Sequence, residues 1–426
     1  MINNLKNKIT HSLTMKNSIW MIIANIIQMI IALFINRTVA EYLDVENYGI
    51  INYGISFVAF FTSLCTLGFN SILIKELINN KNKNGKIIGT SVTLRLISSL
   101  ISIILIYIII FLLKENNKEI VFCALLQSLA LFFDAFTIIG LWYQANLKSK
   151  YVAITGLVSY IVVAIYKLTL VYNKKSIYWF AFSNSLTSIV IGTILIFLYF
   201  KHKGQKFSFS LETGKNLLKN SYHFILSGLM IAIYAQIDKI MIGSILENIS
   251  AVGLYSVATT IITLWSFVPN SIVTAFNPTI VFAKNESKEK YIRRLKQLYS
   301  IIIWLSIAYA LFITIFSKQI IGILYGSKYL GATTALNISI WGVSFSFIGV
   351  VREIWLVNNN IQKYSKWFAI LGALANIILN IFMIPTFVIV GAAIATFITQ
   401  LLTGLIANLF FKETRVNFKY IIEAML

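Results

Sequence analysis

The sequence predicts an all-α protein that crosses a membrane many times, and three observations carry that prediction. Of its 426 residues, 58% are hydrophobic and only 12% are charged, whereas soluble globular chains are about 25% charged. The mean hydropathy is +0.80. Apolar stretches of about 20 residues, the length that a helix needs to cross a bilayer, recur along the chain between short basic segments.

About twelve such stretches occur, and each is expected to form a helix because lipid offers the backbone no hydrogen-bond partners. The first six are expected near 17–40, 49–74, 87–113, 120–143, 151–172 and 177–200. The second six are expected near 220–244, 251–282, 297–317, 331–357, 364–384 and 390–411. The long connection over 201–219 lies at the middle of the chain and predicts a cytoplasmic linker between two six-helix lobes, 1–200 and 220–426.

The basic residues predict the orientation of the chain. With the N-terminus on the cytoplasmic side, 25 of the 36 lysines and arginines fall in cytoplasmic segments, six in outer loops and five inside spans. This distribution follows the positive-inside rule, so the net charge of +21 does not indicate a nucleic-acid partner. Both termini are therefore predicted to be cytoplasmic.

Several functions are excluded by missing motifs. Cys65 and Cys123 lie in apolar segments and predict no disulfide, and the three histidines lack the spacing of metal ligands. Thr213-Gly214-Lys215 resembles the end of a nucleotide-binding loop, but Phe209 stands where that loop needs its first glycine. No cofactor and no catalytic residues are expected, and the protein is not expected to be an enzyme.

Charged side chains inside the predicted spans are the main functional signal. The cations are Arg37, Arg95, Lys167, Lys239 and Arg352, and the anions are Asp134, Asp238 and Glu353. A charge at the bilayer centre costs about 2.5–3.5 kcal/mol on insertion scales, so such residues tend to face the bundle interior or a wet cavity. Residues near span ends can instead extend to the interface. The excess of cations favours an anionic cargo.

The carboxylates and amides leave alternatives open. Asp134 is expected either to pair with Arg95 or to hold a proton or sodium ion. Asp238 and Lys239 are adjacent, so each is expected to need a partner on another helix.

Three amides in the last two spans allow two roles. Asn376 and Asn380 lie four residues apart on one helix face, and Gln400 lies in the last span. These amides are expected to bond sugar hydroxyls or to join neighbouring helices.

A weak internal repeat supports two related halves. Tyr48-Gly49 opens the second predicted span, and Val252-Gly253-Leu254-Tyr255 opens the corresponding span of the second half. The two glycines are 204 residues apart, close to half the chain. Two pseudo-symmetric bundles are typical of transporters.

Five segments together resemble one known family. They are Arg37 with Tyr48-Gly49, Gly140-Leu141-Trp142-Tyr143-Gln144-Ala145 with Lys148 and Tyr151, Ile237-Asp238-Lys239-Ile240-Met241-Ile242-Gly243 with Val252-Gly253-Leu254-Tyr255, Leu324-Tyr325-Gly326 with Tyr329, and Asn376 to Asn380 with Pro385 and Gly391 to Thr396. In order and spacing they resemble the O-antigen flippase branch of the multidrug/oligosaccharidyl-lipid/polysaccharide exporter superfamily. One departure is Pro385-Thr386-Phe387-Val388, where family members have Pro-Lys-Tyr-Gly.

The resemblance implies a twelve-helix protein with two six-helix lobes around a central cavity. It implies a flippase of the bacterial cytoplasmic (inner) membrane that moves a lipid-linked oligosaccharide, usually a repeat unit on undecaprenyl pyrophosphate, from the cytoplasmic to the periplasmic leaflet. The product would be O-antigen, hence lipopolysaccharide, or capsule. Its partners would be this substrate, membrane lipids and other membrane proteins of polysaccharide assembly.

The cations in the spans are expected to bind the pyrophosphate that the resemblance implies, and two other functions remain as alternatives. Arg95, Lys239 and Arg37 are expected to contact the pyrophosphate, with Arg352 and Lys167 as further candidates, because guanidinium groups bind phosphates bidentately. A cation-coupled multidrug exporter of the same superfamily is the first alternative, but its cavity would need an acidic excess. A membrane glycan polymerase is the second, and it would usually carry a large outer loop, which the predicted spans do not leave room for.

Overall fold

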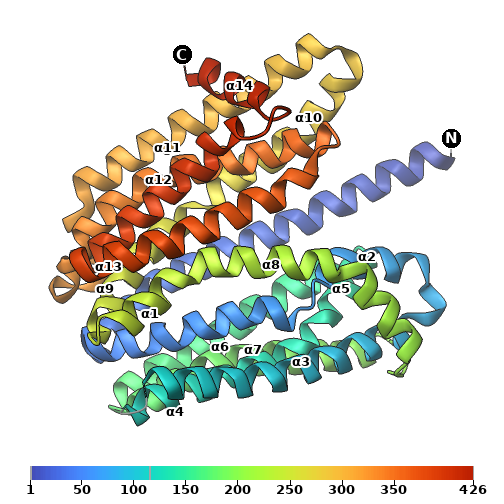
Figure 1. The fold of residues 1–426 in the computed structure, drawn as a ribbon. Coiled ribbons are helices and arrows are strands. Elements are labelled where there is room, and N and C mark those ends of the chain that lie inside the picture. Colours follow the sequence, from blue (N-terminus) through green and yellow to red (C-terminus); the bar gives the residue numbers. More distant parts are fainter. Residues whose placement is uncertain (1, 115–116, 426) are drawn as a thin grey trace. The chain divides into compact units, whose positions relative to one another are not determined.

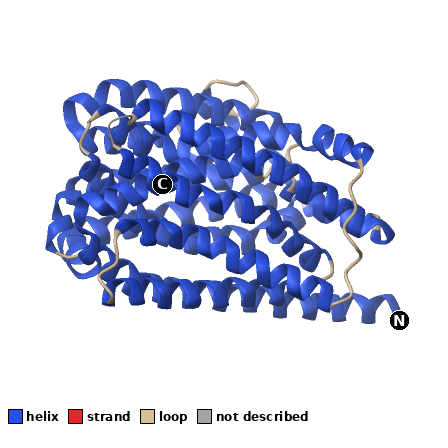
Figure 2. Ribbon diagram, turned by 90° about the horizontal axis from the view of Figure 1, so that it is seen from below, coloured by secondary structure: helices blue, strands red, loops and turns tan. Residues whose placement is uncertain are grey.

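The computed structural model describes the backbone of residues 2–114 and 117–425. Within these ranges the chain forms helices and short turns and contains no strand (Figure 2). Met1, Leu426 and residues 115–116, which fall at the ends of the predicted lobes and in a predicted outer loop, lie outside the described residues. The all-helical prediction is confirmed for the part described.

Nine helical elements of the described chain are long and apolar enough to cross a membrane, or ten if the bent helix α8 (Leu211–Ile245) counts as one span. Two of the nine are too long for one crossing: Ile23–Cys65 has 43 residues and Gln362–Leu409 has 48. At about 1.5 Å per residue each would reach about twice the hydrocarbon thickness of about 30 Å. Each contains one non-helical residue, Asp44 or Val388, at the place where the sequence predicts one span to end and the next to begin.

The chain separates into two compact units. Unit 1 comprises residues 1–43 and 53–232, and unit 2 comprises residues 44–52 and 233–426. The nine residues 44–52 are thus the part of the first 200 residues that belongs to the second unit. The predicted division into lobes 1–200 and 220–426 with a linker over 201–219 stays a prediction.

Unit 1 is a bundle whose long helices run side by side (Figure 1). Its helices are most of α1 (Ile2–Cys65), α2 (Asn70–Asn79), α3 (Asn84–Leu113), α4 (Lys118–Asp134), α5 (Ile138–Ala145), α6 (Ser149–Tyr172), α7 (Ile177–Lys201) and the first part of α8. The helix α7 packs against α4 and α6, and α3 packs against α4. A buried cluster that includes Phe69, Ile88, Tyr143 and Tyr199 joins α2, α3, α5 and α7.

The segment that follows α7 is bound to helix α3. The backbone N–H of Gly85 donates to the side chain of Gln205 at 2.8 Å, and the Tyr199 hydroxyl donates to the Gln205 carbonyl at 2.8 Å. Farther along, the N–H of Ser210 donates to the Thr90 hydroxyl at 3.0 Å. The first part of the predicted linker therefore follows a fixed path along unit 1.

Unit 2 is built around α12. Its helices are the end of α8, α9 (Ile249–Trp265), α10 (Phe267–Glu286), α11 (Lys288–Tyr325), α12 (Thr333–Asn358), α13 (Ser365–Gly404) and α14 (Arg415–Met425). The helix α12 packs against α9, α11 and α13, and the C-terminal α14 lies on α11. The eighth predicted span divides into α9 and α10 just before Pro269, which has no N–H to continue the helical hydrogen bonds.

The break in α13 reverses the chain within a few residues. Val388 has φ 55° and ψ −129°, which is a rare backbone conformation for a β-branched residue. Pro385, three residues earlier, removes a helical hydrogen-bond donor. A Cβ atom at Gly391 would lie 2.0 Å from the carbonyl oxygen of Met383, so only glycine fits the tight return.

Residues 44–52 join unit 2 through a reciprocal glycine contact with α9. A Cβ atom on Gly49 would lie 2.2 Å from the Ile249 carbonyl oxygen, and one on Gly253 would lie 2.4 Å from the Val45 carbonyl oxygen. Each glycine thus faces the carbonyl four residues before the other. Small residues allow this close approach of helices in lipid. The two positions of the weak repeat are in direct contact.

Polar and aromatic contacts hold the same segment. The Asp44 carboxylate forms an ion pair with Lys328, in the short helix Ser327–Ala332. The ring of Tyr48 lies 6.2 Å from the ring of Tyr325 and 5.6 Å from that of Tyr329, both in edge-to-face geometry. Such aromatic pairs contribute about 0.5–1.5 kcal/mol each.

We expect Gly49→Ala to lower the thermal unfolding temperature of the purified protein, because the added methyl group would collide with the backbone of α9. Overpacking of this kind costs about 1–3 kcal/mol. Gly322→Ala is the matched control, since a Cβ atom there meets nothing within 4 Å. That control should be neutral or stabilising by about 0.5–1 kcal/mol. Equal unfolding temperatures for the two variants would contradict the close crossing.

Candidate functional site

Asp238 of α8 is the centre of a buried polar cluster in unit 2. Its side chain is 7% exposed. One carboxylate oxygen accepts from Asn380 Nδ2 at 2.7 Å, and the other accepts from the Tyr255 hydroxyl at 2.7 Å and from the Thr396 hydroxyl. Asn380 Nδ2 also donates to Asn376 Oδ1 at 3.1 Å. The expectation that Asp238 needs partners on other helices is confirmed.

The cluster joins four helical segments. Asp238 lies on α8 and Tyr255 on α9, while Asn380 precedes and Thr396 follows the reversal in α13. Hydrogen bonds to an ionised group contribute about 1.5–3 kcal/mol each, and such bonds let a carboxylate remain charged away from water. The arrangement can therefore hold a buried negative charge in place.

The atoms around Asp238 that could act as ligands limit which cation the cluster could bind. All groups around Asp238 that could face an ion are oxygens of carboxylate, hydroxyl and amide groups, which suit a hard cation rather than a transition metal. No group of three His, Cys, Asp or Glu side chains with metal-ligand geometry occurs among the residues described. Asn380 Oδ1 is buried without a hydrogen-bond partner and is a further potential ligand.

Arg95 of α3 is the most deeply buried cation of unit 1, at 3% exposure. One Nη atom donates to Asn70 Oδ1 at 2.8 Å, and the other donates to the Thr137 hydroxyl at 3.3 Å. Its Nε is buried and has no partner. Arg95 therefore keeps an unused donor next to two neutral partners, which an anion could replace.

The structure shows no direct ion pair between Arg95 and Asp134, one of the two alternatives expected for that carboxylate, although the two charges interact. Among the described side chains, no oxygen of Asp134 lies within 4.0 Å of the Arg95 guanidinium, which instead faces Asn70 and Thr137. The link is indirect, since the Thr137 hydroxyl donates to the Asp134 backbone carbonyl at 2.7 Å. The Asp134 carboxylate faces the Ser188 hydroxyl on α7.

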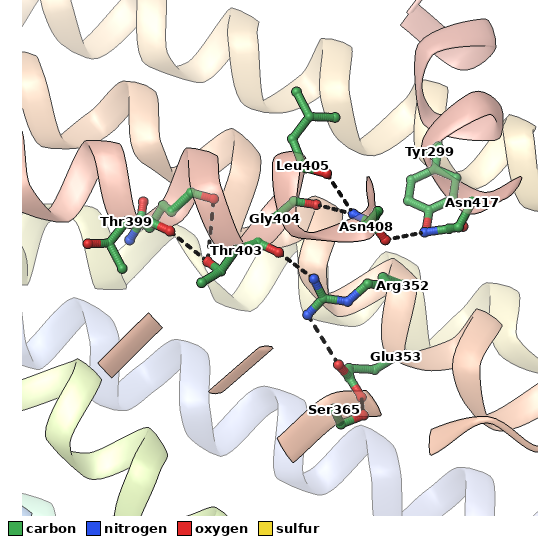
Figure 3. A network of polar contacts seen from close by, with 11 residues as sticks. Tyr299, Arg352, Glu353, Ser365, Thr399, Thr403, Gly404, Leu405, Asn408 and Asn417 are labelled. Atoms are coloured by element: carbon green, nitrogen blue, oxygen red, sulfur yellow. Dashed lines mark hydrogen bonds and ion pairs between the residues drawn. The ribbon is translucent and has the colours of Figure 1, made fainter. Parts of the chain in front are cut away.

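Arg352 and Glu353 form a second polar network in unit 2 (Figure 3). Arg352 is 6% exposed; it donates to the Thr403 carbonyl and lies 3.3 Å from a Glu353 oxygen. Its guanidinium carbon lies 3.9 Å from the centroid of the Phe368 ring. Glu353 also accepts from the Ser365 hydroxyl. Arg352 thus ties α12 to both halves of α13, and it does not extend to the interface.

The remaining cations are more accessible. The Arg37 side chain is 47% exposed and pairs with Glu41 at 3.2 Å. Lys167 on α6 and Lys239 on α8 are half-buried. Neither lysine has an ion pair within the described chain. The structure therefore separates two fixed, buried arginines from three more accessible cations.

The amides expected to contact sugar lie inside unit 2. Asn376 and Asn380 have no exposed surface, and the contacts of Asn380 fit the alternative that they join helices. Gln400 is half-buried and packs against Gly342 of α12, where its Oε1 is buried without a partner. Contact of these residues with sugar stays a prediction.

Sequence reasoning missed several partners of these charges. Tyr255 and Thr396 complete the Asp238 cluster, and Asn70 and Thr137 hold Arg95. The sequence showed only that each of these partners is a polar residue within or beside a predicted span. Which charge it meets depends on how the helices are rotated, and spacing within one helix does not give that rotation.

Comparison with known proteins identifies the family. The family model described as polysaccharide biosynthesis protein matches residues 14–283. The probable flippase AglR of Haloferax volcanii is 27% identical over 275 residues, covering 62% of this chain and 54% of AglR. The capsular polysaccharide biosynthesis protein CapF of Staphylococcus aureus is 20% identical over 409 residues, covering 93% of this chain and 99% of CapF.

A solved structure shows the same fold. The lipid II flippase MurJ in an inward closed conformation superimposes with a TM-score of 0.74 at 18% identity, covering 96% of this chain and 90% of MurJ. The family match spans more than half of the chain, and the described helices have the fold of that transporter. This chain therefore belongs to the polysaccharide biosynthesis protein family, and it is a multi-pass membrane protein whose described helices share the fold of MurJ.

Proposed function

We propose that this protein moves an undecaprenyl-pyrophosphate-linked oligosaccharide unit from the cytoplasmic to the periplasmic leaflet of a bacterial cytoplasmic membrane. The unit would serve a surface polysaccharide such as O-antigen or capsule. The proposal extends the family membership with the charges of this chain. The bias of lysine and arginine toward one set of loops supports an orientation with both termini cytoplasmic.

The observation that carries the proposal is Arg95, a cation inside a spanning helix with an unpartnered Nε. A pyrophosphate offers several charged oxygens to a planar guanidinium, which can bind them bidentately, whereas Asn70 and Thr137 each give Arg95 one uncharged acceptor. Because Arg95 is 3% exposed, the head group reaches it only when the surroundings of α3 open. Alternating access provides such opening.

The other charged residues have supporting roles in this proposal. Arg37, Lys167 and Lys239, the more accessible cations, would meet the pyrophosphate before or after Arg95, and Arg352 would contribute after its own network opens. Asn376, Asn380 and Gln400 remain candidates for sugar contacts. Asp238, with Asp134 and Glu353 as rivals, would couple transport to a cation.

We expect Arg95→Ala to reduce export of the glycan by about ten- to hundred-fold, which corresponds to the loss of one charge-assisted interaction of about 1.5–3 kcal/mol. The measurement is surface glycan in a deletion host complemented with each variant, together with the pool of lipid-linked units in the cytoplasmic leaflet. Lys318→Ala is the control, because this exposed lysine has no ion pair to a described residue and no role in the proposal.

Three outcomes of this complementation separate the candidate functions. Loss of surface glycan with accumulation of complete lipid-linked units supports the flippase. Export of single units without chains would indicate a polymerase, and unchanged glycan with altered drug tolerance would indicate a drug exporter. Full export by Arg95→Ala at normal membrane abundance would sink the role assigned to that arginine.

We expect Asp238→Asn to abolish a cation-dependent rise in the unfolding temperature of the purified protein. Binding to the folded state stabilises it in proportion to the logarithm of ligand concentration, so titration with NaCl against choline chloride reports the site directly. Glu353→Gln and Asp134→Asn are neutralised in the same way and should keep the response. If Glu353→Gln or Asp134→Asn lost the response while Asp238→Asn kept it, the cation site would not be at Asp238.

A further inference from the structure

The hairpin of α10 and α11 concentrates positive charge. Six lysines and arginines occur between Lys284 and Lys296, with two carboxylates, Glu286 and Glu289. The positive-inside rule already accounts for basic residues in such a connection, so their number alone specifies no ligand. Their arrangement around a cavity is a separate observation.

A cavity of about 620 Å³ lies between the end of α10 and the start of α11. This volume is within the range of small-ligand sites. The helix α11 lines it with Lys290, Arg293, Arg294 and Gln297, whose spacing of three and four residues places them on one face. The helix α10 lines the opposite wall with Phe282 and Glu286, among others.

The charges of the lining do not cancel. Lys290 pairs with Glu286 at 2.7 Å, so those two charges compensate each other. Arg294 donates to the neutral Gln297 amide at 2.7 Å. Arg293 has no hydrogen bond or ion pair to any described residue. Among its described residues, the lining therefore holds three cations, Lys290, Arg293 and Arg294, against the single carboxylate of Glu286.

The cavity lies at the shared end of two elements that are longer than one hydrocarbon crossing. The elements Ile249–Glu286 and Lys288–Tyr325 each have 38 residues. At about 1.5 Å per residue, each exceeds the hydrocarbon thickness of about 30 Å, and their shared end carries the charged residues, so we expect that end to extend past the hydrocarbon. Head groups of lipids occupy this depth.

Apolar surface adjoins the basic wall. Phe282 is 68% exposed although it lines the cavity. Trp304 lies seven residues after Gln297, hence on nearly the same face of α11 but deeper in the span, and is 56% exposed. A soluble anion would gain nothing from these side chains, whereas the chains of a lipid would cover them.

We propose that the cavity between α10 and α11 binds the phosphodiester head group of an anionic phospholipid, with Arg293 and Arg294 on the phosphate and Phe282 and Trp304 against the chains. Guanidinium groups suit phosphate oxygens because they offer paired donors. This site is separate from Arg95 and does not depend on which glycan the protein moves.

The test measures thermal unfolding of the full-length protein in nanodiscs of phosphatidylcholine, with and without phosphatidylglycerol. Phosphatidylglycerol should raise the unfolding temperature of the wild type. Arg293→Ala/Arg294→Ala should lose about half or more of that shift, because these two guanidinium groups are the proposed ligands of the phosphate. The single variant Arg293→Glu should also lose this shift in unfolding temperature. It replaces the double variant in the test if the double variant folds poorly.

Lys83→Ala/Lys86→Ala is the matched control. These lysines line a cavity of about 320 Å³ in unit 1 that also contains Glu76 and Glu212, so its charges balance. This variant removes the same number of cations and should keep the full shift.

Three results would overturn the proposal. The first is an equal shift in Arg293→Ala/Arg294→Ala and in the control. The second is equal stabilisation of the wild type by inorganic pyrophosphate in pure phosphatidylcholine, which would indicate a site for soluble phosphates. The third is a response to undecaprenyl phosphate without one to phosphatidylglycerol, which would indicate a site for the carrier lipid.

Discussion

An ionised side chain inside a spanning helix must find its partners within the protein, because hydrocarbon supplies none. That constraint explains how the helices of each unit are tied together. Asp238 receives three hydrogen bonds from two other helices, and Arg352 joins α12 to both halves of α13. Apolar packing alone discriminates poorly between helix rotations in lipid, which is as apolar as the side chains. The buried charges therefore fix rotations that hydropathy leaves free.

Hydropathy predicted the spans well because span length depends only on bilayer thickness and backbone hydrogen bonding. The expected ends near residues 40 and 384 lie four residues before the non-helical residues Asp44 and Val388. The pairing of charges was harder to predict. Arg95 and Asp134 have opposite charges on neighbouring helices, yet Arg95 faces Asn70 and Thr137. The spacing along one helix gives relative directions within it, and says nothing of which direction faces its neighbour.

The structure gives the repeated glycines a packing role that the sequence alone did not reveal. Gly49 and Gly253 occupy corresponding positions in the weak internal repeat, which supported only the prediction of two related halves. In the structure each glycine faces the carbonyl four residues before the other. Only glycine permits backbones this close, so local packing explains both residues.

The Asp238 carboxylate connects the two parts of α13 that lie before and after its reversal. Asn380 lies before the reversal at Val388 and Thr396 lies after it, so one carboxylate holds both halves. An ionised carboxylate only accepts hydrogen bonds, whereas a protonated one donates as well. Protonation would remove the charge that strengthens these three hydrogen bonds and would add a donor to the carboxyl group, while a bound cation would compete for the same oxygens. Either event changes which contacts hold the two halves together. A ligand shifts a conformational equilibrium only if it interacts differently with the two states. A proton or cation at Asp238 would do so if the two states differ in the contacts between the halves of α13.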